Sequence, residues 1–262
     1  MKIHKISYRF LMVITLTCLS TLASADTVTI LSDKWFPVNG DPKSDQPGYM
    51  IEIAKTILNK HGHSLDYRLA PWTRSLIEVR EGRADCVVGA YKEDAKDFIF
   101  PKNPWGKAKF NFYTKADSSW TFNEINDLGL ITLGVISGYA YNPKIDEYVR
   151  KNHRSAAVQL VSGESALEQN IRKLLVNRID ALIAYDVVIE SELKILNISD
   201  KLKISGEVKP PEFMYIACSP EKSSSIKYTK LFSDGVVELR EKGVLQRILK
   251  KYGIKDWIDG ST

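Results

Sequence analysis

The chain has 262 residues, of which 44% are hydrophobic and 26% are charged, and its formal net charge is +5. Three of the 37 basic residues fall in the first 25 positions, so 34 basic residues remain against 32 acidic ones. A surplus of +2, spread along the sequence, argues against a nucleic-acid-binding protein. The 237 residues after position 25 are enough for one domain or for two.

The first 25 residues have the pattern of a cleaved secretory signal. Basic residues come first, an apolar stretch follows at 10–19, and Ala23-Ser24-Ala25 supplies the small residues of a cleavage site. The apolar stretch is short for a membrane span, which disfavours an uncleaved anchor. We therefore expect cleavage near Ala25 and a soluble protein exported to the periplasm.

One local pattern occurs twice. Gly82-Arg83-Ala84-Asp85 leads into an apolar run that ends at Tyr91, and Asn177-Arg178-Ile179-Asp180 leads into one that ends at Tyr185. Each run follows an amphipathic helical pattern, and each is short enough to be a strand buried on both faces of a parallel sheet. The repeat predicts two similar lobes.

The predicted elements, in chain order, alternate between strands and helices. The first half has strands at 28–32, 65–69 and 86–89, helices at 49–60 and 73–81, and an extended strand at 107–115. The second half has strands at 131–136, 157–161 and 181–184 and helices at 139–151, 165–176 and 187–196. An extended strand at 213–219 and helices at 225–242 and 244–252 complete the chain. This order is typical of parallel sheets covered by helices.

The fold class is therefore α/β, with two Rossmann-like lobes. We place the first part of lobe 1 at 26–113, lobe 2 at 114–213, and the rest of lobe 1, with the C-terminal helices, at 214–262. Cys86 and Cys218 both lie in apolar strand-like runs. Two buried thiols and a disulfide bridge are both compatible with that pattern, because the sequence does not show whether the two residues are close.

Ligands of open parallel sheets bind just beyond the carboxyl ends of the strands. Trp35, Trp72 and Tyr91 follow strands of the first lobe, where aromatic rings can stack on an apolar or a cationic ligand. Asp186 follows a strand of the second lobe, where it can accept hydrogen bonds from an amine or cap the next helix. Arg74 opens a helix and can hold a carboxylate or phosphate if it points into the cleft.

The tripeptide Ser137-Gly138-Tyr139 comes between a predicted strand and a predicted helix. Free N–H groups at a helix start attract anions, although an ordinary helix start gives the same pattern. No catalytic motif of the serine-hydrolase, nucleotide-binding or zinc-peptidase type is present. The histidines lack metal-ligand spacing, so we expect neither a metal nor a cofactor.

Several weak motifs together resemble the family 3 extracytoplasmic solute-binding proteins of ABC importers, which have the type II periplasmic binding fold. The motifs are Trp35, Gly48-Tyr49-x-x-Glu52, Trp72, Gly82-x-x-Asp85, Phe100 with Pro104, Ser137-Gly138, Arg178-x-Asp180 and Lys250-Lys251-Tyr252-Gly253. The resemblance implies two lobes joined by two crossing hinge strands, with a ligand trapped by closure. It also implies that Asp186 occupies a position that often receives the ligand's amino group.

The chain departs from this pattern at one position. Amino-acid binders of the family usually carry Thr-x-x-Arg after the third strand, and here that region reads Tyr91-Lys92-Glu93-Asp94. Asp94 therefore replaces the arginine that holds the ligand's carboxylate. Either Arg74 supplies the missing cation or the ligand is not an amino acid. The candidate ligand-binding residues are Trp35, Tyr49, Trp72, Arg74, Ala90, Tyr91, Asp94, Ser137, Gly138, Tyr139 and Asp186.

These features favour a monomeric periplasmic protein that captures a small polar, amino-acid-like solute for an ABC permease. Two alternatives remain. One is a dehydratase-like enzyme on the same fold, with Glu52 or Asp94 as acid or base. The other is a sensory module that signals to a membrane sensor instead of a transporter. Fold alone does not choose among these functions.

Overall fold

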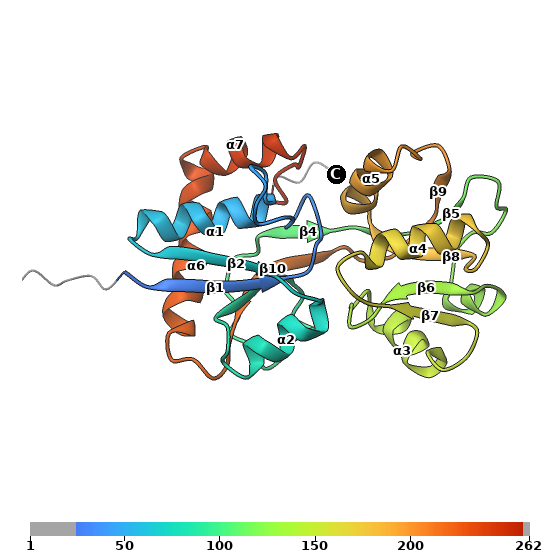
Figure 1. The fold of residues 1–262 in the computed structure, drawn as a ribbon, viewed down its shortest axis with the longest axis horizontal. Helices are drawn as coiled ribbons and strands as arrows, with labels where there is room; N and C mark the ends of the chain where they lie inside the picture. Colours follow the sequence, from blue (N-terminus) through green and yellow to red (C-terminus); the bar gives the residue numbers. More distant parts are fainter. Residues whose placement is uncertain (1–24, 259–262) are drawn as a thin grey trace, which may run out of the picture.

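The computed structural model describes residues 25–258. They form two lobes that lie side by side along the long axis of the molecule (Figure 1). Each lobe is built on a five-stranded sheet, with the strand orders β2-β1-β3-β10-β4 and β7-β6-β8-β5-β9. In the first sheet β2, β1 and β3 are parallel, and β10 and β4 join them as antiparallel strands. In the second sheet β7, β6 and β8 are parallel, and β5 and β9 join them as antiparallel strands. The predicted two-lobed α/β architecture is confirmed.

The first lobe contains both ends of the described chain. Its elements are β1 (Thr27–Ser32), α1 (Tyr49–Lys60), β2 (Ser64–Leu69), α2 (Trp72–Arg80), β3 (Cys86–Ala90), β4 (Gly106–Ala108), β10 (Glu212–Cys218), α6 (Ser225–Glu241) and α7 (Val244–Lys251). Helix α1 buries its apolar face against the sheet and against α6. The two helices approach closely at Gly235, where a Cβ would lie 2.8 Å from the side chain of Ile57.

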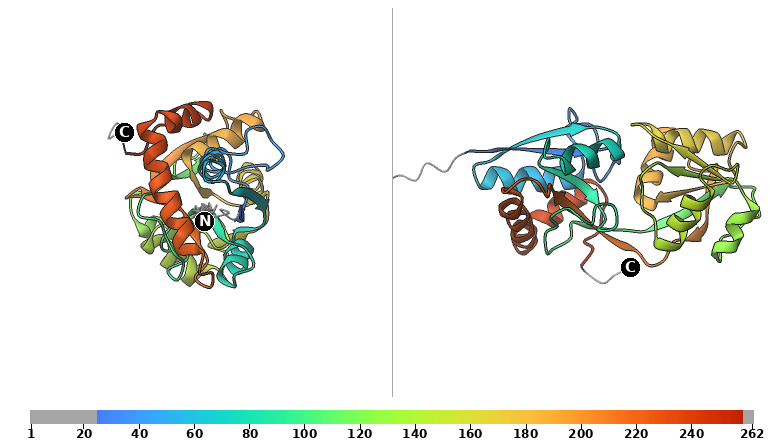
Figure 2. Two further views of the ribbon diagram at one scale, coloured as in Figure 1. Left: turned by 90° about the vertical axis from the view of Figure 1, so that its left-hand side faces the viewer. Right: turned by 90° about the horizontal axis from the view of Figure 1, so that it is seen from below.

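The second lobe is one continuous insertion between β4 and β10. Its elements are β5 (Phe110–Lys115), a 3₁₀ helix (Ile125–Leu130), β6 (Leu133–Ile136), α3 (Pro143–Asn152), β7 (Val158–Val161), α4 (Ala166–Leu175), β8 (Ala181–Tyr185), α5 (Asp186–Ile195) and β9 (Leu202–Glu207). The chain passes into the second sheet at Lys109 and returns between Glu207 and Glu212. The two connecting segments run side by side between the lobes (Figure 2). The predicted boundaries, after residues 113 and 213, differ from these crossings: residues 110–113 belong to β5 of the second sheet, and Glu212 and Phe213 belong to β10 of the first.

The motif that repeats in the sequence has the same structural role in both lobes. Asp85 accepts a hydrogen bond from the backbone N–H of Thr29 at 2.7 Å, and Asp180 accepts one from that of Thr132 at 2.8 Å. The motif begins with a left-handed residue in each copy, Gly82 in the first and Asn177 in the second. Each aspartate therefore fixes the start of a third strand to the first strand of its own sheet.

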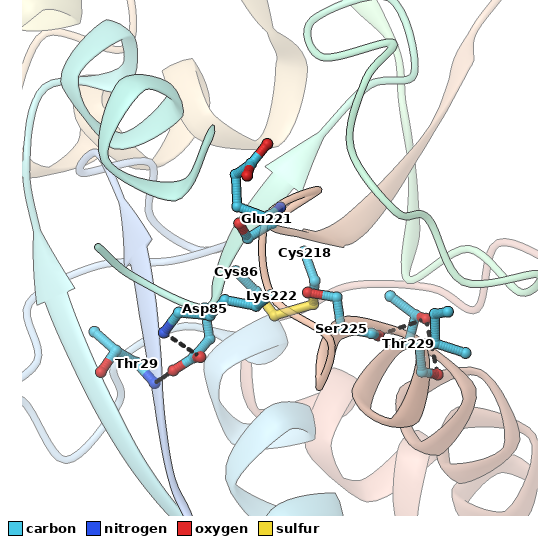
Figure 3. The surroundings of a disulfide bond; sticks show 10 residues. Thr29, Asp85, Cys86, Cys218, Glu221, Lys222, Ser225 and Thr229 are labelled. Atoms are coloured by element: carbon cyan, nitrogen blue, oxygen red, sulfur yellow. Dashed lines mark hydrogen bonds and ion pairs between the residues drawn. A yellow bond between two sulfur atoms is a disulfide. The ribbon is translucent and has the colours of Figure 1, made fainter. Parts of the chain in front are cut away.

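Cys86 and Cys218 form a disulfide across neighbouring antiparallel strands, β3 and β10 (Figure 3). Both cysteines are fully buried. The bond closes a sequence separation of 132 residues that includes the whole second lobe. Beside it, Lys222 donates to Asp85 at 2.7 Å, which ties the loop before α6 to the same strand (Figure 3).

Two local predictions differ from the structure. Helix α3 begins at Pro143 instead of residue 139, because the Asn142 side chain caps it by accepting from the Ile145 N–H at 2.9 Å. Strand β9 was not predicted; it is an edge strand with little apolar alternation. Within residues 25–258, no helix combines the length and the apolar character that crossing a bilayer requires.

Candidate functional site

A narrow cavity lies where the carboxyl ends of the strands of the two sheets face each other. It is lined by Asp33, Trp35, Trp72, Val88, Gly89, Tyr91 and Asp94 from the first lobe and by Tyr139 and Ala140 from the second. The lobes are in contact around it, since the Tyr139 hydroxyl donates a hydrogen bond to Asp33 Oδ2. The structure is therefore a closed form of the molecule.

Aromatic rings from both lobes line this cavity or contact the rings that line it. The Trp35 ring lies 6.2 Å from that of Tyr139 and 5.3 Å from that of Tyr185, measured between centroids. Phe110, at the crossing into the second lobe, lies 6.0 Å from Tyr91 and 6.2 Å from Tyr185. The wall is thus complete only when the two lobes meet.

The close approach of the lobes depends on a glycine. Gly138 has a φ of +81°, and a Cβ at this position would lie 2.5 Å from Thr73 Oγ1 on the opposite lobe. Gly89, in the cavity lining, has a φ of +84°, which favours glycine, and a Cβ there would lie 3.3 Å from Asn39 Oδ1 and 3.5 Å from the Trp35 ring. Both glycines therefore shape the cleft by the space that they leave open.

Two carboxylates face the cavity. Burial raises the pKa of Asp33 to about 6, although the hydrogen bond from Tyr139 opposes the shift. Burial likewise raises the pKa of Asp94 to about 8, and the neighbouring carboxylates of Asp146 and Glu212 add to the effect. Both groups therefore hold protons more tightly than a solvated aspartate, because their charge is poorly solvated in the closed form.

Two polar atoms at this site have no hydrogen-bond partner among the described residues. They are the hydroxyl of Tyr91, a residue that is only 5% exposed, and Oδ1 of Asp94. The other carboxylate oxygen of Asp94 accepts from the backbone N–H of Tyr91 at 2.8 Å. Buried polar atoms are nearly always paired in proteins, so the free oxygen of Asp94, a residue that lines the cavity, is available to a ligand.

The cavity is small in this closed form. It encloses room for about one water molecule, within about 270 Å³ of space that is partly open to solvent. A larger guest needs the lobes to separate. No group of three metal-binding side chains lies close together anywhere in residues 25–258, so the described residues offer no metal site.

The structure brings together most of the residues predicted for the site. Trp35, Trp72, Tyr91, Asp94 and Tyr139 line the cavity, and Ala90 and Gly138 adjoin it in the chain. Ser137 lies in the outer part of the cleft, together with Arg74.

Arg74 does not point into the cavity. Its side chain is 71% exposed, and Nε lies 3.7 Å from Glu78 Oε1 one helical turn away. The arginine is therefore a rim residue, and the cavity contains no basic side chain among the described residues that line it.

Two further predicted residues lie outside the cavity lining. Tyr49 is fully buried in the core of the first lobe. Asp186 is the first residue of α5, where its carboxylate accepts from the N–H of Val187 at 2.7 Å; the N-cap position is Tyr185, which makes no side-chain cap. The backbone N–H groups of Ser137 and Tyr139 already donate to Val161 and Ile136, so no helix start offers them to an anion.

Sequence reasoning missed four lining residues, which are Asp33, Val88, Gly89 and Ala140. A signal for Asp33 was present, because it directly follows the first predicted strand. Val88 and Gly89 lie within the predicted third strand, and only the assembled structure places them in the cavity lining.

The sequence matches the family described as "Bacterial extracellular solute-binding proteins, family 3" over residues 28–255. The chain belongs to this family. No curated protein matches the sequence of this solute-binding protein at a significant level.

Solved structures share the fold of this solute-binding protein at low sequence identity. A mutant of ArgBP from T. maritima aligns with a TM-score of 0.72 at 18% identity, covering 87% of this chain and 95% of that one. The L-arginine-bound substrate-binding protein AbpA from Streptococcus pneumoniae aligns at 0.69 and 21% identity, covering 89% and 98%. A histidine kinase sensor domain similar to periplasmic binding proteins aligns at 0.71 and 17% identity, covering 86% and 95%.

Asp94→Asn is expected to stabilise the empty protein at pH 8. Burial raises the pKa of Asp94 to about 8 from 3.8, so between these pH values the folded protein holds a proton that the unfolded chain releases. The contribution of Asp94 to the free energy of unfolding is therefore full below pH 4 and is lost as the pH rises to 8. Asparagine keeps an acceptor for the Tyr91 N–H and carries no charge. The melting temperature should rise by about 3 °C at pH 8 and hardly at all at pH 4, as measured by calorimetry. An unchanged or lower value at pH 8 would contradict the prediction.

Proposed function

We propose that this solute-binding protein captures a small polar solute, of about the size of an amino acid, between its two lobes and delivers it to an ABC importer. The observation that carries the proposal is the closed cavity, whose wall is shared between the lobes. Asp33 and Trp35 come from one lobe and Tyr139 from the other, and the hydrogen bond between Asp33 and Tyr139 exists only when they meet.

The mechanism follows from that shared wall. When the lobes part, the solute reaches the carboxyl ends of the first-lobe strands, and rotation about the crossings at Lys109 and at 208–211 returns Tyr139 to it. A ligand shifts the equilibrium only by binding the closed form better than the open one. A solute that contacts both lobes satisfies this condition.

Location and partners are part of the same proposal. The leader predicted at 1–25 lies outside the described residues except for Ala25, and the family is extracellular by its own description. We infer export to the periplasm, action as a monomer, and docking of the closed form on a permease.

An enzymatic role has less support. Of the two acid–base candidates, Glu52 lies outside the cavity, where its carboxylate accepts from Lys251 and from the Tyr252 hydroxyl, both at 2.7 Å. A sensory role is favoured by one observation, the likeness to a histidine kinase sensor domain. That likeness shows a shared fold and nothing more. In a sensory role, the same closure of the lobes would signal to a membrane sensor.

Binding by closure can be tested with solute panels. We expect at least one solute among amino acids, amines, small acids and sugars to raise the melting temperature by about 5 °C at saturating concentration. The same solute should reduce the radius of gyration in small-angle X-ray scattering. If no solute changes either quantity, and the purified protein carries none by native mass spectrometry, the proposal fails.

A matched pair of variants places the binding in this cleft. Tyr139→Phe removes the hydroxyl that bridges to Asp33 and should weaken binding of the selected solute about tenfold. Tyr148→Phe removes a hydroxyl that bonds to the Leu128 carbonyl within the second lobe, and it should leave affinity unchanged. Equal affinities of the two variants for the solute would mean that the solute does not bind in this cleft.

A further inference from the structure

We infer that the solute is an organic cation that carries no carboxylate, held between the carboxylates of Asp33 and Asp94 and the rings of Trp35 and Trp72. The inference rests on the proposed function, since it names the class of solute for the same cavity.

The charges of the cavity have one sign. Asp33 and Asp94 both line it, and no described lining residue is basic. The carboxylates of Asp146 and Glu212 lie close enough to Asp94 to raise its pKa further. A buried carboxylate ionises readily only beside a positive charge, and a cationic solute would supply that charge to both aspartates.

The unpaired atoms match a ligand that donates hydrogen bonds. Oδ1 of Asp94 makes no hydrogen bond of normal geometry, although the backbone N–H of Ala140 on the other lobe also lowers the pKa of this carboxyl, and the Tyr91 hydroxyl lacks a partner. Ammonium and guanidinium groups carry several N–H donors and no acceptor. Such a group reaching this end of the cavity can donate to the free carboxylate oxygen of Asp94.

The rings complete a site for a cation. Trp35 and Trp72 line the cavity together with the two aspartates, and Tyr139 closes it from the other lobe. The faces of tryptophan and tyrosine attract organic cations, most strongly where water is excluded. Both tryptophans are less than a tenth exposed in this closed form, so lobes that close over a bound cation would keep water from these rings.

The same lining excludes a carboxylate. An amino acid bound here would place its carboxylate in a poorly solvated cavity whose described lining offers no arginine or lysine to balance it. Arg74, on the rim, is solvated and already lies near Glu78. A buried charge without a partner is costly, so loss of the solute's carboxylate should favour binding.

Pairs of probes that differ by one carboxylate test this inference. The pairs are agmatine and arginine, cadaverine and lysine, histamine and histidine, and choline and glycine betaine. In thermal-shift and calorimetric titrations of the full mature protein, we expect a carboxylate-free member to raise the melting temperature by about 5 °C and to bind at least tenfold more tightly than its partner.

Two substitutions link that binding to the named carboxylates. Asp33→Asn and Asp94→Asn keep acceptors for Tyr139 and for the Tyr91 N–H, and each should reduce affinity for the selected cation at least tenfold. Asp97→Asn, an exposed carboxylate three positions away that pairs with Arg80, should leave affinity unchanged. Because the variants preserve the hydrogen bonds, circular dichroism should show each of them folded.

The outcomes separate the inference from the proposed function. If an amino acid, an anion or a neutral solute stabilises the protein and no carboxylate-free cation does, the cation inference is overturned and capture by closure stands. If a cation binds but the two aspartate variants bind it as well as the parent, the inference is overturned too. If nothing in the wider panel binds, the proposed function fails together with it.

Discussion

Reduction of the Cys86–Cys218 disulfide is expected to lower the free energy of unfolding by about 4 kcal/mol and the melting temperature by about 10 °C. The bond closes a separation of 132 residues, so its removal frees a long loop in the unfolded chain. Both cysteines are buried between β3 and β10, and the folded lobe keeps its packing around the thiols. Calorimetry with and without dithiothreitol measures the effect.

The double variant Cys86→Ala/Cys218→Ala is the control for reduction. It should melt near the temperature of the reduced parent and should not respond to dithiothreitol. The disulfide lies within the first lobe and outside the cavity lining, so ligand affinity below the melting transition should be retained. A parent protein that melts at the same temperature with and without reductant would contradict the prediction.

Gly138→Ala is expected to weaken ligand binding about tenfold to a hundredfold. In the closed form the new Cβ would lie 2.5 Å from Thr73 Oγ1 on the other lobe, and no real Cβ tolerates that distance. The free-energy cost of this contact falls on the closed state alone, because Gly138 and Thr73 separate when the lobes open. A clash of this kind costs about 1–3 kcal/mol, and each 1.4 kcal/mol is a factor of ten in affinity. Calorimetric titration with the selected solute measures it.

Two further variants separate closure from backbone strain. Gly62 has a similar φ of +75°, and a Cβ added there would meet no atom within 4 Å, so Gly62→Ala has the strain without the contact. It should lower stability and leave affinity unchanged. Adding Thr73→Ala to Gly138→Ala removes the clashing hydroxyl and should restore most of the affinity. Failure of this rescue would mean that the lobes do not meet at Gly138.

The local sequence determined the architecture of this protein and part of its site. The repeated motif that ends at Asp85 and Asp180 predicted two equivalent lobes, because each copy must start a buried strand beside the first strand of its sheet. Trp35, Trp72 and Tyr91 were predicted from their positions after strands, since the topology of a parallel sheet brings strand ends together whatever the details of packing.

Only the tertiary structure decided which of these side chains face one another. It placed Cys86 beside Cys218, turned Arg74 to the solvent, and joined Asp33 to Tyr139 across the cleft. Hydrophobic periodicity reports which face of an element is buried, and it carries no information about the neighbour that covers that face. The charge of the cavity therefore became visible only when residues far apart in the chain were assembled around one space.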